Sequence, residues 1–231
     1  MMTSFTGLPK DYFAFFKELE VNNNREWFND NKQRFRNSVQ EPLAAFVEAM
    51  APKLKKISKH FVADPRLNGG SVFRIYKDVR FSKDKSPYKT HGAVQFRHTL
   101  GRDVHAPGFY VHLDPDEIFY GGGVWMPPAP ALLKVRETIR DKGQKWLKAK
   151  TGAAFDQRFG QIRGDQLTRP PRGFDANHPH IEDIKRKSFF AMAEAKPSSA
   201  RKAEFVDHVA ETFTDAKPLM KFLCEALGIS F

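Results

Sequence analysis

The residues best suited to chemistry lie between Ser71 and His91, in the stretch SVFRIYKDVRFSKDKSPYKTH. Hydroxyl groups alternate there with cations, and such a mixture suits phosphate oxygens because Arg offers a forked contact and Lys a point charge. Two aspartates can pair with the cations and hold them in place. We therefore expect the binding site here, with ligand contacts from Arg74, Tyr76, Asp78, Arg80, Lys85, Tyr88 and Lys89.

Alternation over residues 71–78 predicts a strand whose polar face carries Arg74, Tyr76 and Asp78, while Phe73 and Ile75 face the core. Arg74 would then serve function more than folding. Strands over 90–97 and 109–113 would add polar neighbours to the same face, namely His91, Gln95, Tyr110 and His112. This face could bind a phosphate or carboxylate, stack a ring, and use His as an acid or base. The alternative is a structural polar network beneath a loop or helix.

The charge of the chain points to the same region. Segments 71–91 and 130–187 together account for the whole formal net charge of +11, so the remainder is balanced. Localised positive charge attracts polyanions or phosphorylated ligands, although many basic proteins bind no anion at all. The leading prediction is therefore an anionic ligand, with a nucleotide or nucleic acid as the foremost candidate.

A Pro-rich segment, residues 163–180, predicts an ordered surface loop. Loops often carry site residues on a rigid scaffold. We expect Arg172 and His178 from this loop to close over the polar face of the predicted sheet.

Metal and cofactor signals are weak. Four histidines recur every seven residues from His91 to His112, but an odd interval alternates the faces of a strand. His178 and His180 have no third ligand at typical spacing, and Gly121–Gly123 fits neither the dinucleotide nor the P-loop pattern. We therefore expect no cofactor and no metal, although ligands assembled from distant residues remain open.

The element order places helices before and after a group of short strands. Helices are predicted over residues 9–20, 25–37, 42–57, 130–147, 181–194, 199–214 and 218–227, and strands over 71–78, 90–97, 109–113 and 117–120. Strands joined by turns imply an antiparallel meander. The prediction is an α+β fold, a meander of about four or more strands packed by N- and C-terminal helices, in one domain spanning 1–231.

Several motifs together resemble a widespread family of bacterial and fungal proteins that is known only as a conserved domain of unknown function. They are NNNREWF, FRIYKDVRFSKDKSPYKTH, PGFYVHLDP, GGGVW and PPRGFDANHP. The resemblance runs from Phe5 to about Phe190. It implies no reaction and no cofactor, but it implies that the central block and the later PRGFD block recur together, which favours one shared site.

The sequence also bounds the location and the class of function. No apolar run is long enough for a membrane span, no signal peptide is evident, and the single Cys224 fits a reducing compartment, so we expect a cytoplasmic protein with no membrane partner. One alternative to anion binding is a metal-independent enzyme in which His112 or His91 is the acid or base and Asp78 orients it. The other is a partner-binding scaffold, and the oligomeric state stays open.

Overall fold

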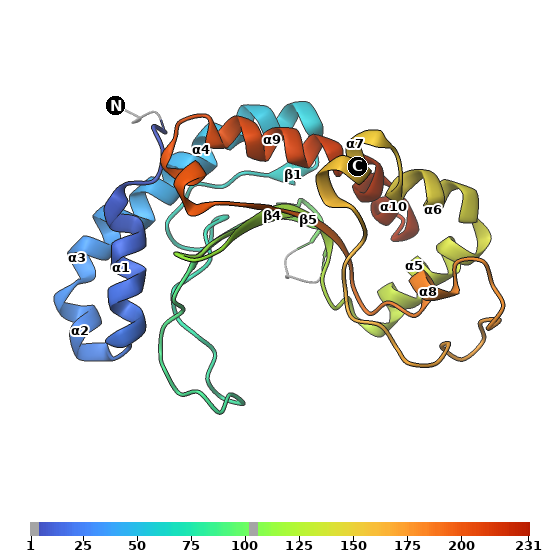
Figure 1. The fold of residues 1–231 in the computed structure, drawn as a ribbon, viewed down its shortest axis with the longest axis horizontal. Coiled ribbons are helices and arrows are strands. Elements are labelled where there is room, and N and C mark those ends of the chain that lie inside the picture. Colours follow the sequence, from blue (N-terminus) through green and yellow to red (C-terminus); the bar gives the residue numbers. More distant parts are fainter. Residues whose placement is uncertain (1–4, 102–105) are drawn as a thin grey trace.

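A five-stranded antiparallel sheet forms the centre of the computed structural model, which describes residues 5–101 and 106–231 (Figure 1). The strands lie in chain order, so each pairs with its sequence neighbours. They are β1 (Phe61–Val62), β2 (Gly92–His98), β3 (Gly108–Leu113), β4 (Ile118–Val124) and β5 (Phe189–Ala195). This confirms the predicted α+β class with an antiparallel meander.

One face of the sheet is packed by three helices, α4 (Glu41–Ile57), α9 (Phe205–Asp215) and α10 (Lys217–Ala226) (Figure 1). Alternation sends apolar side chains to this face, where Phe109 stacks on Phe213 with ring centroids 4.5 Å apart. The side chains between them point to the opposite face, which these helices leave uncovered. These three helices therefore build their part of the core on one face of the sheet, and they leave the other face open for a site.

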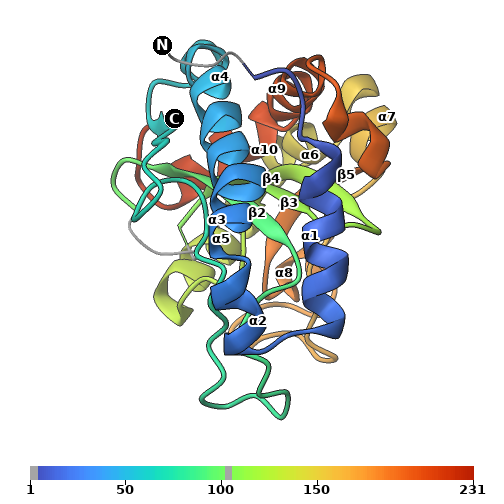
Figure 2. The ribbon, with the colours of Figure 1, turned by 90° about the vertical axis from the view of Figure 1, so that its left-hand side faces the viewer.

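The N-terminal helices stand at one end of the strands (Figures 1 and 2). They are α1 (Lys10–Val21), α2 (Arg25–Asp30), α3 (Lys32–Phe35) and a π-helical turn, η1 (Arg36–Gln40), that leads into α4. Asn24 caps α2 by accepting a hydrogen bond from the Trp27 amide at 2.9 Å. The Tyr12 hydroxyl donates to the Leu113 carbonyl at 3.1 Å, which ties α1 to the end of β3.

A second group of helices packs at the other end, and a long loop runs beside it. This group contains α5 (Ala129–Asp141), α6 (Gly143–Lys150), α7 (Ala153–Phe159) and α8 (Ile181–Ile184). A 3-10 turn, η2 (Pro197–Arg201), follows β5 and lies beside the N-terminal segment, where the Leu8 amide donates to the Ala200 carbonyl at 2.8 Å. Within the described residues, no helix combines the length and the apolar character needed to cross a membrane.

Residues 71–78 do not form the predicted strand. They make two isolated bridges, one from Val72 to Val94 and one from Tyr76 to Tyr88. The second bridge folds residues 73–90 back on themselves, with the Lys89 amide donating to the Ile75 carbonyl at 2.8 Å. We call this segment the arm, and it projects beyond the sheet in both views (Figures 1 and 2). Residues 71–73 still bond to β2, and beyond Phe73 pairing within the arm replaces pairing with the sheet.

Strand β5 was also mispredicted, because residues 189–194 lie at the end of a predicted helix. Ala, Met and Glu favour helices in isolation. Here pairing with β4 along seven residues outweighs this helix preference, since it buries Phe189 and Ala191 against the core. Glycine in β4 permits it, because a Cβ at Gly121 would collide with the Ala191 carbonyl oxygen.

Candidate functional site

The uncovered face of the sheet contains a hollow of about 650 Å³, which we call the sheet hollow. Strand pairing builds it, since Gln95, Tyr110, Gly121 and Met192 lie side by side across four strands, as do His112, Phe119 and Glu194 across three. Its lining consists of Phe73, His91, Gln95, Ala106, Gly108, Tyr110, His112, Glu117, Phe119, Gly123, Trp125, Arg163, Phe190, Met192 and Glu194.

Aromatic rings form most of its walls. Phe73 from the arm meets Tyr110 edge to face with ring centroids 6.1 Å apart, and Trp125 meets Phe190 at 5.4 Å. Between the rings, Gly108 and Gly123 contribute no side chain, which leaves room above the strands. Flat apolar walls with a few polar groups are typical of sites for small organic ligands.

Two imidazoles meet at one end of the sheet hollow. The rings of His91 and His112 lie 4.2 Å apart between centroids. Burial lowers the pKa of His91 to about 4, and the charge that His112 would carry when protonated and the ammonium of Lys89 lower it further. Burial also lowers the pKa of His112, partly offset by Asp114 and Glu117. Both rings are therefore neutral near pH 7 and can accept a proton or a metal ion.

Tyr110 completes this polar group. Its hydroxyl shares a hydrogen bond of 3.2 Å with Nδ1 of His112, and burial raises the pKa of Tyr110 to about 12. The phenol thus keeps its proton at physiological pH. On its other side, His112 stacks on Phe119 with ring centroids 4.4 Å apart, so the imidazole is held on two sides.

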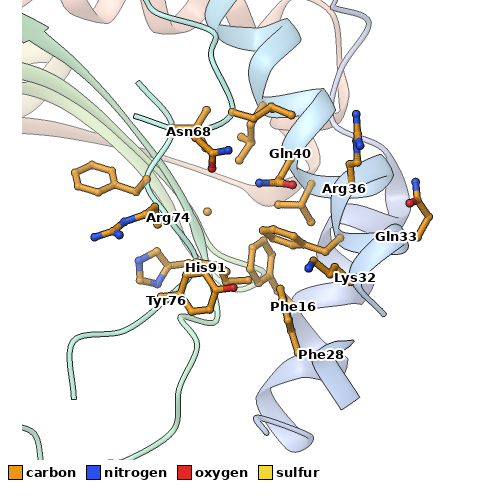
Figure 3. A pocket seen from close by; sticks show the side chains of 18 of the residues that line it. Phe16, Phe28, Lys32, Gln33, Arg36, Gln40, Asn68, Arg74, Tyr76 and His91 are labelled. Carbon is orange, nitrogen blue, oxygen red and sulfur yellow. The ribbon is translucent and has the colours of Figure 1, made fainter. Parts of the chain in front are cut away.

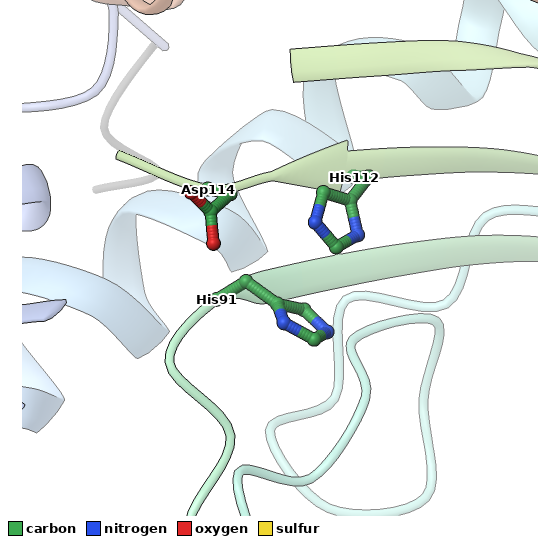
Figure 4. A group of neighbouring side chains, drawn as sticks. All are labelled: His91, His112 and Asp114. Carbon is green, nitrogen blue, oxygen red and sulfur yellow. The ribbon is translucent and has the colours of Figure 1, made fainter. Parts of the chain in front are cut away.

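Asp114 lies beside the two histidines, directly after β3 (Figure 4). One potential ligand atom from each of His91, His112 and Asp114 lies within 4.8 Å of the other two. These are the residues in the described part of the chain that are grouped closely enough to hold a metal ion.

Cations gather where the arm joins the sheet. The Lys89 ammonium lies 5.3 Å from the centroid of the Phe73 ring and donates to the Arg74 carbonyl at 2.9 Å. Burial lowers the pKa of Lys89, and the Arg74 guanidinium lowers it further. The Arg97 guanidinium lies 5.7 Å from the same ring. Across residues 5–101 and 106–231, no carboxylate forms an ion pair with Lys89 or Arg74.

A second hollow, of about 750 Å³, separates the base of the arm from the N-terminal helices (Figure 3). We call it the arm hollow. Arg74, Tyr76 and His91 line it from one side, and residues of α2, α3 and η1 line it from the other. Figure 3 shows Lys32 and Tyr76 directed toward its middle, while Arg74 points away from the helices. His91 lines both hollows, so the two spaces meet at this residue.

Most of the charged side chains at the tip of the arm bond to other groups of the arm. Asp78 pairs with Arg80 at 2.7 Å, and the side-chain hydrogen bond from Arg80 lowers the pKa of Asp78 to about 2. Lys77 pairs with Asp84, and the Lys85 ammonium donates to the Val79 carbonyl at 3.0 Å. Asp78 therefore orients its own neighbour and not His91 or His112, contrary to the role that the sequence suggested.

Tyr88 anchors the arm and does not face a ligand. Only 4% of its surface is exposed, and its ring stacks on Phe28 of α2 with centroids 4.1 Å apart. Asn23 bonds to both its amide and its carbonyl. Tyr76 packs against Tyr88 from outside and is largely exposed.

Arg172 and His178 do not join this group. Their loop lies beside α5 and α8, on the opposite side of the molecule from the arm (Figure 1), and neither residue lines either hollow. Nearby, Phe174 contacts Arg140 of α5 through its ring face at 5.6 Å. From the same segment, Arg163 reaches the sheet hollow instead, pairing with Glu194 at 2.9 Å.

Sequence reasoning missed several lining residues. The β5 residues fall within the predicted helix over 181–194, and Trp125 is not among the predicted site residues. Asp114 could have been found, because alternation through Tyr110 and His112 places the next even-numbered residue on the same face.

These features define an α+β protein with helices on one face of an antiparallel sheet and an aromatic, histidine-containing hollow on the other. The chain belongs to the family described as "Conserved hypothetical protein (DUF2461)", whose model matches residues 11–222. This confirms the resemblance to a conserved domain of unknown function. No curated protein matches the chain.

Proposed function

We propose that the protein binds a small anionic ligand with a planar ring, of the size of a mononucleotide. The ring lies in the sheet hollow among Phe73, Tyr110 and Phe119, and the anionic group lies near Lys89 and Arg74. The proposal includes the cytoplasmic location that the single cysteine favours.

The observation that carries the proposal is the pair of like charges at the base of the arm. Lys89 is partly buried beside Arg74, and burying an ammonium next to another cation costs free energy unless an anion compensates. No carboxylate from the described residues does so. A phosphate or carboxylate of the ligand would supply the missing charge and gain charge-assisted hydrogen bonds.

A small ligand fits better than a nucleic acid chain. Three cations of the arm tip, Lys77, Arg80 and Lys85, already have partners, whereas an extended backbone would need a row of available ones. The aromatic lining offers stacking for a single ring. Nucleic acid remains the alternative. The salt dependence of the affinity distinguishes the two ligands, because counterion release makes nucleic-acid binding weaken steeply as the salt concentration rises.

The test uses adenosine monophosphate and adenosine as probes, followed by the fluorescence of Trp125, which lines the sheet hollow and is half exposed. We expect the monophosphate to bind at least about 10-fold more tightly than the nucleoside, since each charge-assisted hydrogen bond contributes roughly 1.5–3 kcal/mol. Lys89→Met should remove this preference. Lys83→Met, at the exposed arm tip, is the matched control and should keep it. Equal affinity for both probes would overturn the proposal.

A second candidate is acid–base catalysis on the same ligand, favoured by the neutral His91 and His112 beside Tyr110. Here an imidazole would accept a proton from a ligand seated in the sheet hollow. Prolonged incubation of the wild-type protein and a His112→Gln variant with adenosine monophosphate, followed by chromatography, tests this. Product formed by the wild type alone supports catalysis, and equal product from both contradicts it.

A further inference from the structure

We propose that His91, His112 and Asp114 bind a divalent transition-metal ion at the end of the sheet hollow, with an open coordination position facing that hollow. The inference does not depend on which ligand the hollow accepts. It revises the expectation from the sequence that no metal site is present.

Two neighbouring strands, β2 and β3, bring the three ligands together. His91 immediately precedes β2, His112 lies within β3, and Asp114 follows β3 directly. Because Ala93 is paired with His112, the antiparallel register places the start of β2 next to the end of β3. A ligand set on neighbouring strands is positioned by backbone hydrogen bonds and not by a flexible loop.

The separations suit an ion after a small adjustment. The three ligand atoms lie within 4.8 Å of one another, and ligands about 2.1 Å from a tetrahedral ion lie roughly 3.4 Å apart. Each pair therefore needs to close by at most about 1.4 Å by the same geometry. Figure 4 shows a ring nitrogen of His112 directed toward Asp114, with the His91 ring below them.

His112 is held in an orientation suited to a metal ligand. Its Nδ1 is engaged by the Tyr110 hydroxyl, which leaves Nε2 for an ion, and Phe119 supports the face of the ring. Histidines that bind metals usually make such a second hydrogen bond, which fixes the ring and its tautomer.

The ligand types indicate which ions fit. Two imidazole nitrogens and one carboxylate suit zinc or iron(II), whereas calcium and magnesium prefer oxygen ligands throughout. Three protein ligands leave at least one position open, as in catalytic sites, while structural zinc sites are closed by a fourth. His91 and His112 also line the sheet hollow, so the open position would be reachable from there.

The surrounding charges act in both directions. Glu117 and Asp114 place negative charge near His112, which favours a cation. Lys89 places positive charge near His91, which opposes one. A metal next to Lys89 would strengthen the attraction for an anionic ligand, so an ion and an anion are expected to support each other's binding.

The test is a titration of untagged, chelator-treated full-length protein with Co²⁺, followed by visible absorption and by calorimetry. We expect one equivalent to bind and to be displaced by Zn²⁺. Asp114→Asn keeps the shape of the side chain but removes its charge, and His91→Gln removes one nitrogen ligand. Each should weaken Co²⁺ binding by at least about 10-fold, the lower end of the loss seen for supporting residues alone.

The control is His178→Ala, which alters a second pair of neighbouring histidines. The ring centroids of His178 and His180 lie 5.8 Å apart. This variant should bind Co²⁺ as the wild type does. Circular dichroism confirms that each variant is folded. Co²⁺ bound equally by the wild type, Asp114→Asn and His91→Gln would overturn the inference, as would loss of binding in His178→Ala alone. Since the probe is a metal and not a nucleotide, failure here leaves the anion proposal standing.

Discussion

Two polar groups inside this protein differ in how their charges are matched. Around Asp183, which is 6% exposed, every strong contact joins opposite charges or a donor with an acceptor. The carboxylate accepts from Trp146 Nε1 at 2.8 Å and pairs with Lys150 at 2.8 Å and Arg186 at 3.2 Å. At the base of the arm, Lys89 and Arg74 adjoin each other with no acidic partner among the described residues.

The comparison separates charges that complete the fold from charges that, under the proposed function, would pair with an anionic ligand. The Asp183 group ties α6 to α8 and borders neither hollow. The Lys89 group borders both, through Phe73, Arg74 and His91. Matched buried charges contribute to folding only when they are all present, whereas unmatched cations beside a hollow oppose folding slightly and favour an anion.

The largest expected effect is on stability, from Asp183→Asn. Removing the carboxylate leaves Lys150 and Arg186 without their counter-charge, which should cost roughly 2–4 kcal/mol, somewhat below the value for fully buried pairs because Lys150 is a quarter exposed. Urea denaturation measures it. Glu182→Gln, one residue earlier and exposed, is the matched control and should change little. A small loss of unfolding free energy in Asp183→Asn would show that the matched charges around Asp183 do not stabilise the fold as the comparison requires.

The same residue predicts a dependence on pH. Burial alone would raise the pKa of Asp183, but the Lys150, Trp146 and Arg186 contacts outweigh it and the pKa is lowered. A carboxyl whose folded pKa lies below its unfolded value of about 3.9 stabilises fully above that pH. This contribution is lost as pH falls through the folded pKa. Denaturation of wild type and Asp183→Asn should therefore differ most above about pH 5 and converge in acid. A constant difference across that range would contradict the assignment.

The sequence predicted the central strands and part of the site. Clean alternation identified β2, β3 and the start of β4, and with them the shared face of Tyr110 and His112. Such alternation is a local signal that survives in the fold. His91 was expected on this face as well, and it lies against His112.

What the sequence misjudged depends on contacts between distant segments. Strand β5 exists because glycines in β4 let its backbone approach, which its own helix-favouring residues do not reveal. The arm pairs with itself because Tyr88 is anchored on Phe28, far earlier in the chain. The dense charge of residues 71–91 led to the prediction that Asp78 and Arg80 bind a ligand. These two residues form an ion pair with each other, and such a pair between near neighbours needs no ligand.

A smaller effect on stability is expected from Arg74→Ala. Its side chain is exposed and pairs with no carboxylate in the described ranges, and Asp78, which could have been its buried partner, binds Arg80 instead. Removing one of two like charges should leave the free energy of unfolding within about 0.5 kcal/mol. The affinity for adenosine monophosphate should fall by about 10-fold, the loss of one charge-assisted contact. A collapse of the thermal melt would make Arg74 structural.

The smallest effect on both measurements is expected at the arm tip, from Arg80→Ala. Arg80 is exposed, its charge is already matched by Asp78, and it borders neither hollow. The melting temperature and the affinity for adenosine monophosphate should therefore equal those of the wild type. A labelled oligonucleotide, measured by anisotropy at several salt concentrations, gives the decisive contrast. If Arg80→Ala weakens oligonucleotide binding and lowers the salt slope by about one, then the arm tip contacts phosphates directly. In that case, cations that are exposed and already paired within the arm would form the binding surface. Matched charges would then serve binding as well as folding, and the distinction between the Asp183 group and the Lys89 group would not hold at the arm tip, where the charge density of the sequence is highest.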